Sequence, residues 1–191
     1  MEIHFIRHGK TLANEKKLYC GSTDLPLSEI GRSEINELKG QGIYPAADIF
    51  FTSGLLRTKQ TFEIIYTGAE NIIIPEIAEF NFGIFEMKSY DDLKENADYL
   101  AWINDTTGNV LCPGGDSRNL FERRVMDGFD KIINQTRTSS MVICHGGVIV
   151  TVMEKLFPGE RNFYEWQPEP GRGYVLDARG KTLDAGKYKP I

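Results

Sequence analysis

Short apolar runs alternate with longer segments of helical period along the chain. Runs at residues 3–6, 47–53, 72–74 and 139–144 are almost continuously apolar, which is typical of strands covered on both faces. Segments at residues 28–39, 55–66, 90–104, 117–133 and 148–156 are predicted as helices. This alternation predicts a three-layer α/β/α sandwich with a mostly parallel central sheet.

Polar residues mark two of the predicted helix starts. We expect Ser53 to cap the helix at 55–66, and either Asp116 or Ser117 to cap the helix at 117–133. The tail is predicted to form a late strand followed by a turn at Arg179 and Gly180. A chain of 191 residues, 41% of them hydrophobic, can bury one sizeable core, so we expect a single domain over residues 1–191.

Composition limits the partners and the compartment. A formal net charge of −5 and a pI near 5.3 argue against nucleic-acid and anionic-membrane partners, which need a basic surface. Three cysteines without a CxxC pair favour a reducing compartment and no disulfide framework. The start "MEIHFIRHG" has no leader pattern, and no apolar run reaches membrane-spanning length. We therefore expect a cytoplasmic protein; the oligomeric state is not predicted.

The first and last strands both end in a histidine followed by glycine, in "RHG" and "CHGG". Because the carboxyl ends of parallel strands meet at one edge of a sheet, Arg7, His8 and His145 are expected there together. Arg57 falls in the first turn of the helix after the second strand, where free N–H groups and the helix dipole favour anions. Two arginines and two histidines are thus predicted to line one crevice.

This set of residues suits phosphoryl transfer. Arginine forks bind phosphoryl oxygens and spread the charge that develops during transfer. A neutral imidazole can attack phosphorus and form a phosphohistidine without a metal or another cofactor. Either His8 or His145 would be the nucleophile, and the other would stabilise the equatorial oxygens. The leaving alkoxide needs a proton, for which we expect Glu79 as the carboxylic acid, with Glu86 as the alternative.

Five motifs in this order resemble the histidine phosphatase superfamily, whose fold is phosphoglycerate mutase-like: "RHGKT" with Asn14, "TSGLLRT", "EFNFGIFE", "PGGDS" with "RRV", and "CHGG". The resemblance runs from residue 3 to about residue 156. It implies that His8 is the phosphorylated nucleophile and that Glu79 is the proton donor. The phosphate contacts that it implies are Arg7, Asn14, Arg57 and His145.

The resemblance also implies a branch and a substrate class. Mutases of the family carry a longer insertion between the acid and the second histidine, so net hydrolysis is expected here. The segment "FGIFEMKSYDDLKENADYLAWIND" resembles the α-ribazole-5′-phosphate phosphatases of cobalamin synthesis. A small phosphorylated metabolite is therefore the expected partner; a broad sugar-phosphate or nucleotide phosphatase and a mutase-like enzyme are the alternatives. The candidates for the substrate pocket are Cys20, Gly21, Glu86 and Gly146, of which Cys20 replaces a small polar residue usual in relatives.

Two alternatives come from other classes. The segment "CPGGDSR" matches the C-x5-R phosphate loop of cysteine-dependent phosphatases, in which the thiolate of Cys112 would attack phosphorus. Against it, the preceding residues are polar and turn-like, and Pro113 lacks an N–H group for the loop. A non-catalytic phosphate-binding module is the other alternative. In the helix at 90–104 we expect Tyr99 and Trp102 to pack against the core rather than to bind a substrate ring.

Overall fold

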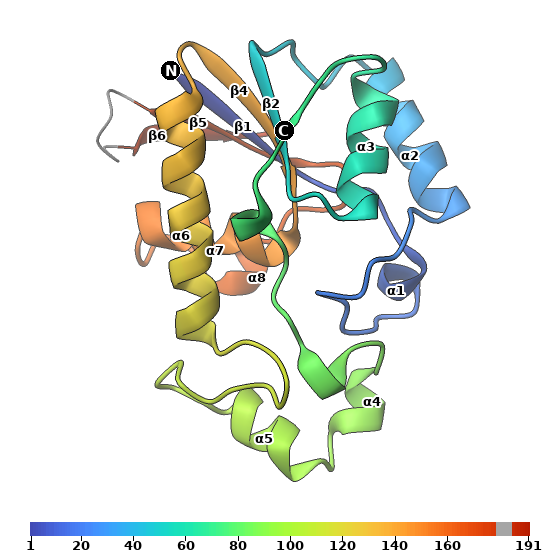
Figure 1. Ribbon diagram of the computed structural model, residues 1–191, viewed down its shortest axis with the longest axis vertical. Helices are drawn as coiled ribbons and strands as arrows, with labels where there is room; N and C mark the ends of the chain where they lie inside the picture. Colours follow the sequence, from blue (N-terminus) through green and yellow to red (C-terminus); the bar gives the residue numbers. More distant parts are fainter. Residues whose placement is uncertain (179–184) are drawn as a thin grey trace.

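The computed structural model describes residues 1–178 and 185–191, and a six-stranded sheet forms the centre of this part (Figure 1). The strand order is β3-β2-β4-β1-β5-β6. Four strands pair in parallel, namely β1 (Glu2–Arg7), β2 (Ile49–Thr52), β3 (Ile72–Ile73) and β4 (Ser139–Cys144). The strands β5 (Gly173–Ala178) and β6 (Ala185–Pro190) pair antiparallel at one edge. The mostly parallel sheet and the late strand are confirmed; the turn predicted at Arg179 and Gly180 lies outside the described residues.

Helices cover both faces of the sheet. One apolar cluster joins Ile3 and Phe5 of β1 to α6 (Arg118–Gln135) and α7 (Gly146–Leu156). The other joins Ile6 of the same strand to α2 (Glu29–Gly40) and α3 (Leu56–Ile65). Figure 1 shows α6 on the left and α2 and α3 on the right, with α7 between them. The predicted three-layer sandwich is confirmed. Side chains of successive strand residues point to opposite faces of the sheet, so Phe5 and Ile6 belong to the apolar clusters on its two sides.

The long helices lie close to their predicted positions, but one predicted cap is wrong. Ser28 and Ser117 are the N-caps of α2 and α6, and each side-chain oxygen accepts a hydrogen bond from a backbone N–H of the first turn. The N-cap of α3 is Leu55, not Ser53, and it has no side-chain cap bond. The hydroxyl of Ser53 is instead bound to a histidine in the site described below. The helix predicted at 148–156 begins two residues earlier, directly after His145.

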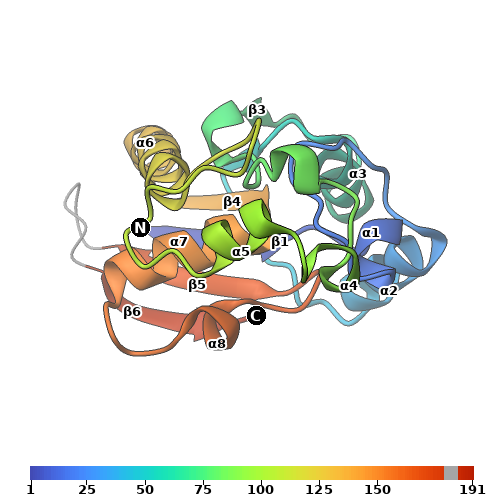
Figure 2. The same cartoon turned by 90° about the horizontal axis from the view of Figure 1, so that it is seen from below.

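The helix predicted at residues 90–104 is two separate helices, α4 (Tyr90–Leu93) and α5 (Ala97–Ile103). The side chain of Asn96 accepts a hydrogen bond from the backbone N–H of Tyr99, so the chain restarts a helix there instead of continuing one. Both helices lie beyond the carboxyl ends of the parallel strands, in the foreground of Figure 2. Four short helical elements were not predicted, and neither was the strand β6. These helical elements are α1 (Leu12–Glu15), η1 (Pro75–Ile77), η2 (Gly83–Phe85) and α8 (Phe163–Trp166).

The prediction that residues 72–74 form a strand covered on both faces is wrong. Strand β3 is only two residues long, and Ile72 and Ile73 are 40% and 49% exposed, so helices do not cover this edge strand on both faces. All three cysteines are free thiols. Among the described helices, none combines the length and the apolar character needed to cross a membrane.

Candidate active site

The ends of β1 and β4 bring the two histidines together. His8 directly follows β1, and its backbone N–H donates to the carbonyl of Cys144, the last residue of β4 (3.0 Å). His145 is the next residue, and the two imidazole centroids are 5.1 Å apart. Both rings are buried, with exposed fractions of 5% and 0%. The parallel register of two neighbouring strands therefore creates this pair.

The surroundings of His8 select one tautomer. Its Nδ1 atom lies 2.7 Å from the carbonyl oxygen of Gly9. Because a carbonyl oxygen can only accept, Nδ1 carries the hydrogen and Nε2 keeps its lone pair. Burial, together with the positive charges of Arg57 and Arg7, holds the pKa of His8 well below its usual range, although the bond to Gly9 opposes this shift. The ring is therefore neutral at pH 7, with Nε2 as a free nucleophilic nitrogen.

His145 is held in the opposite tautomer by a chain of hydroxyl groups. Its Nε2 atom lies 2.8 Å from Ser53 Oγ, which lies 3.1 Å from Thr58 Oγ1, and that hydroxyl donates to the carbonyl of Leu55 (2.7 Å). Since the chain ends on a carbonyl, every group in it donates away from the ring, so Nε2 carries the hydrogen. Its Nδ1 atom accepts from Nε of Arg57 (3.3 Å). Burial and the charge of Arg57 hold the pKa of His145 well below its usual range.

Arg57 occupies the first turn of α3, as predicted, and it is 1% exposed. Its Nη1 and Nη2 atoms donate to the carbonyl oxygens of Thr23 (3.0 Å) and Gly21 (2.7 Å). The guanidinium therefore connects the ring of His145 to the segment 21–23, and the N–H groups not used in these bonds remain for an anion.

Arg7 supplies a buried donor without a partner. Its Nη1 atom donates to the carbonyl of Pro168 (2.8 Å), but Nε is buried and makes no hydrogen bond with any residue that the structure describes. Burial lowers the pKa of Arg7, while the charges of Glu79 and Glu169 oppose this shift. An orphaned buried N–H group suits an anionic oxygen. Within residues 1–178 and 185–191, no set of three or more His, Cys, Asp or Glu side chains is grouped to hold a metal ion.

Glu79 reaches the same place from a loop. Its Oε2 atom accepts a hydrogen bond from the N–H of Gly147 in the first turn of α7 (2.9 Å), and Oε1 accepts from the N–H of Phe80 (2.9 Å). A Cβ atom on Gly147 would lie only 2.4 Å from Oε1 of Glu79. The carboxylate thus lies against the helix that starts beside His145, and a glycine is needed for this close approach.

Glu86 has a different role from the proton donor considered above. Its carboxylate accepts from the backbone N–H groups of Gly21, Ser22, Thr23 and Phe82, and from the hydroxyl of Thr23 (2.7 Å). Burial raises the pKa of Glu86, but these hydrogen bonds outweigh burial and lower it overall. An ionised carboxylate whose oxygens are occupied in this way anchors the segment 21–23, which favours Glu79 over Glu86 as the candidate acid.

Asn14 and Cys20 make hydrogen bonds to residues close to them in the sequence. The side-chain Oδ1 atom of Asn14 accepts from the backbone N–H of Thr11 (2.9 Å) in the capping box of α1. Cys20 is half-buried, and its thiol donates to the carbonyl of Thr23 (3.6 Å). Burial raises the pKa of the Cys20 thiol. The role of Asn14 as a phosphate contact stays a prediction.

The two pocket glycines permit close approaches of the chain. A Cβ atom on Gly21 would lie 1.6 Å from the carbonyl oxygen of Phe80, so the segment 21–23 can touch the loop of Glu79 only with glycine at this position. A Cβ atom on Gly146 would lie 2.7 Å from Nε2 of Gln167 and 3.4 Å from Nε of Arg7. Gln167, which was not predicted as a site residue, therefore lines the same corner as Arg7.

The cysteine-phosphatase alternative is wrong. Cys112 is fully buried, and burial, with the nearby charges of Asp116 and Glu86, raises the pKa of its thiol to about 12. Arg118, which would complete the C-x5-R loop, is exposed and donates to the carbonyl of Asp105 (3.2 Å). The match is therefore a coincidence of spacing, and Cys112 is a core residue.

The helix with Tyr99 and Trp102 packs in the way that was expected. Tyr99 is 1% exposed, and its hydroxyl lies 2.6 Å from that of Tyr19. The ring of Trp102 is 5.7 Å from that of Phe80, the residue after Glu79. These aromatic rings pack beside the loop that contains Glu79.

The chain is similar in sequence to several known proteins. The profile of the histidine phosphatase superfamily (branch 1) matches residues 3–184. The adenosylcobalamin/alpha-ribazole phosphatase of Salmonella typhimurium is 30% identical over 166 residues, which cover 82% of this chain and 79% of that protein. A protein of Erwinia tasmaniensis named probable phosphoglycerate mutase GpmB is 28% identical over 164 residues, 80% of this chain and 74% of its own.

Solved structures extend the similarity to the fold. An Escherichia coli crystal structure, provisionally assigned as an alpha-ribazole-5′-P phosphatase, superposes with a TM-score of 0.83 at 27% identity and covers 95% of this chain and 92% of that one. The crystal structure of phosphoglycerate mutase from Thermus thermophilus has a TM-score of 0.70 at 30% identity, with 93% of each chain covered. The predicted phosphoglycerate mutase-like fold is confirmed.

Proposed function

Because the chain belongs to the histidine phosphatase superfamily (branch 1) and is a phosphatase of small phosphorylated substrates, we propose that it is a metal-independent phosphomonoesterase with His8 as the nucleophile. One observation carries the proposal. The bond from Nδ1 of His8 to the carbonyl of Gly9 leaves Nε2 unprotonated beside two arginines. A buried neutral imidazole in this state is ready to attack phosphorus without a base to activate it.

In the first step, Nε2 of His8 bonds to phosphorus as the ester P–O bond breaks. Arg7 and Arg57 hold the non-bridging oxygens, whose charge is best stabilised in a buried site. In the complex with a dianionic substrate, a proton taken from solvent occupies Nδ1 of His145. Nε of Arg57 then donates to the phosphoryl oxygens instead of to Nδ1, and Nδ1 of His145 donates to the same oxygens while its Nε2 continues to donate to Ser53. In this scheme both histidines act on the phosphoryl group, one as nucleophile and one as donor.

The leaving alkoxide takes its proton from the carboxyl group of Glu79. In the second step Glu79 accepts a proton from water, the water oxygen bonds to phosphorus, and the P–Nε2 bond breaks to release phosphate and restore His8. The contact of Glu79 with the start of α7, beside His145, supports this assignment. General acid catalysis of this kind typically contributes about 10²- to 10⁴-fold.

We propose α-ribazole 5′-phosphate as the substrate. The proposal is supported by relatives and a structural neighbour named for alpha-ribazole phosphate hydrolysis, at 27% to 30% identity. A broader sugar-phosphate or nucleotide phosphatase, or a mutase-like activity, is the second candidate, because other relatives are named phosphoglycerate mutase GpmB.

Turnover assays of the purified protein with EDTA test both levels of the proposal. The panel contains α-ribazole 5′-phosphate, sugar phosphates, nucleoside monophosphates and 3-phosphoglycerate, with His8→Ala and Cys112→Ser beside the wild type. We expect the highest kcat/KM on α-ribazole 5′-phosphate, and activity that only His8→Ala abolishes. A flat panel would remove the substrate assignment, conversion of 3-phosphoglycerate to its isomer would favour the mutase, and full activity of His8→Ala would overturn the mechanism.

A further inference from the structure

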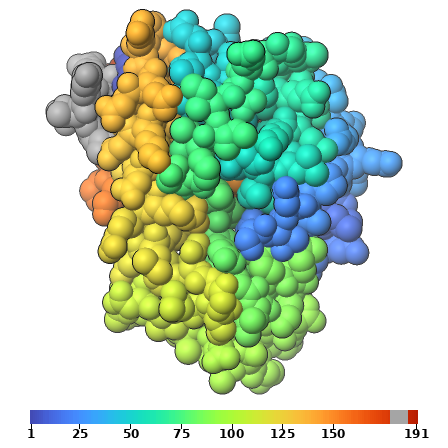
Figure 3. Space-filling view, in the orientation of Figure 1, coloured from blue at the N-terminus to red at the C-terminus, as the bar shows by residue number. Residues whose placement is uncertain are grey.

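The acid loop, residues 75–86, has little regular structure to hold Glu79 in place. It lies between the edge strand β3 and α4, and two short 3₁₀ turns are its only helical parts. In Figure 3 the green of this loop lies between the yellow of α6 and the blue of the N-terminal segments. We propose that Arg124 of α6, held by Asp116, is the positioning residue that aims Glu79 at the leaving group. This inference rests on the proposed role of Glu79 as the proton donor.

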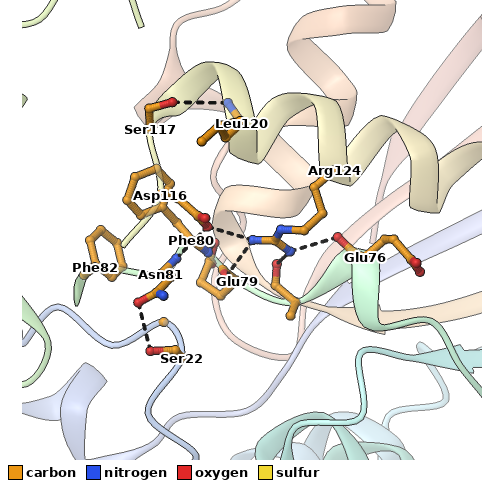
Figure 4. Close-up of polar contacts among 12 residues, drawn as sticks. Ser22, Glu76, Glu79, Phe80, Asn81, Phe82, Asp116, Ser117, Leu120 and Arg124 are labelled. Atoms are coloured by element: carbon orange, nitrogen blue, oxygen red, sulfur yellow. Dashed lines mark hydrogen bonds and ion pairs between the residues drawn. The ribbon is translucent and has the colours of Figure 1, made fainter. Parts of the chain in front are cut away.

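Arg124 binds the backbone of the acid loop at three points. Its Nη1 atom donates to the carbonyl oxygens of Glu76 (3.0 Å) and Ala78 (2.8 Å), and Nη2 donates to that of Glu79 (3.2 Å). Figure 4 shows the side chain reaching from the helix into the loop. A planar guanidinium imposes a fixed geometry on the carbonyls that it binds, so these three bonds fix the backbone from which the carboxyl group of Glu79 extends.

Asp116 completes this arrangement from the other side of Glu79. Its Oδ2 atom accepts from Nη2 of Arg124 (2.9 Å) and from the backbone N–H of Asn81 (3.0 Å), and its own N–H donates to the carbonyl of Asn81 (2.9 Å). The side chains of Arg124 and Asp116 are 29% and 22% exposed, so solvent only partly screens the pair. The loop is therefore bound at Ala78, immediately before Glu79, and at Asn81, two residues after it.

Two helices, α6 and α7, hold the backbone and the carboxylate of Glu79. Its backbone carbonyl is bound by α6, and its carboxylate is bound by the N–H of Gly147 in α7. The guanidinium of Arg124 also lies over the ring of Phe121 one turn earlier in α6, 5.2 Å from the ring centre. Gly128 lets η1 approach the same helix closely, because a Cβ there would lie 2.8 Å from Cγ2 of Ile77. Loss of Arg124 would release the backbone end of Glu79, and it would also remove one of the positive charges that lower the pKa of His145, which Arg124→Lys retains.

The dependence of kcat/KM on the leaving group separates positioning of the acid from general damage. The parameter kcat/KM covers the steps up to release of the leaving group, and a leaving group of low pKa needs no proton. We expect Arg124→Met to lower kcat/KM for an alkyl phosphate by about 10- to 100-fold, and that for 2,4-dinitrophenyl phosphate by less than about threefold. Arg123→Met is the matched control, because Arg123 is the exposed neighbour on the same helix. Both of its kcat/KM values should match those of the wild type.

Glu79→Gln provides the reference, and thermal unfolding of each variant reports its folding. If Glu79→Gln lowers both kcat/KM values equally, the acid role proposed above is wrong, and this inference falls with it. If Glu79→Gln is selective for the alkyl phosphate but Arg124→Met is not, the inference alone is overturned. Should Arg124→Met not fold, Arg124→Lys and Asp116→Asn take its place, since both retain a polar group of similar length. The same selective loss in either variant supports the proposal, and equal losses for both esters reject it.

Discussion

The two halves of the active site are built in different ways. The half that contains His8 and His145 stands on the ends of two paired strands, where the register of β1 and β4 fixes both residues through the backbone. The half that contains Glu79 is an irregular loop, held chiefly by the side chain of Arg124 from α6 and by that of Glu86 at the end of the loop itself. One half depends on the sheet, and the other depends on polar contacts between distant segments.

This difference separates their expected roles in catalysis. The nucleophile half acts on the phosphoryl group, which is common to all substrates, so a defect there should lower the rate for every ester. The acid half acts on the leaving group, so a defect there should depend on how much that group needs a proton. Variants of the two halves should therefore differ in which esters lose activity as well as in how far kcat/KM falls.

The largest effect is expected for His8→Ala. Without the nucleophilic Nε2 atom, kcat/KM should fall by roughly 10⁴-fold or more, for alkyl and dinitrophenyl esters alike. The measurement is steady-state turnover of both esters, together with trapping of an acid-labile phosphoenzyme. A phosphoenzyme that still forms in His8→Ala would contradict the assignment of the nucleophile.

Gly147→Ala tests the acid half without touching an ionisable residue. The added Cβ would lie 2.4 Å from Oε1 of Glu79, so the carboxylate has to leave its position on α7. A displacement of about 1 Å can cost about 100-fold, and we expect a loss of this order for an alkyl phosphate but not for 2,4-dinitrophenyl phosphate. Gly40→Ala, at a helix position with no neighbouring atom within 4 Å, is the control. Equal losses for both esters would mean that the two halves are not separable.

Ser53→Ala tests the nucleophile half at its second histidine. Removing the hydroxyl leaves the buried Nε2–H group of His145 without its acceptor, a cost of about 1–3 kcal/mol. We expect kcat/KM to fall by roughly 10-fold for both esters, because the hydroxyl supports a donor to the phosphoryl group. Ser53→Thr retains the hydroxyl and should recover most of the activity. A loss confined to the alkyl ester would place Ser53 with the acid half instead.

The same difference explains what could be predicted from the sequence. Strand ends and helix starts leave local patterns, so the positions of His8, His145 and Arg57 were predictable. Ser53 was expected to cap a helix, because its spacing suits a cap equally well and its true partner lies 92 residues away. The contacts of Glu86 with the segment 21–23 and of Arg124 with the acid loop have no period along the chain, so no local pattern indicates them.

The smallest expected effect is on the free energy of unfolding, whose dependence on pH should differ between the two halves of the site. Burial lowers the pKa of His8 and His145, so below about pH 6.5 the unfolded chain binds protons that the folded site rejects. The free energy of unfolding should therefore be constant above this pH and fall as the pH drops from 6.5 towards 5, by an amount on the order of 1 kcal/mol per histidine.

Glu86 has the opposite kind of linkage. Its hydrogen bonds lower its pKa, so its contribution is present above about pH 4.5 and is lost only as the pH falls through the lower folded value. Urea unfolding between pH 8 and pH 3 measures both ranges. His8→Gln should reduce the decline between pH 6.5 and 5, where His145 still contributes, and leave the more acidic decline unchanged. Glu86→Gln should lower stability near neutral pH and reduce only the acidic decline, to which Glu76 and Asp105 also contribute. If each variant changed both ranges, the two halves would share one electrostatic network, and the division of the site between sheet and loop would not describe its energetics.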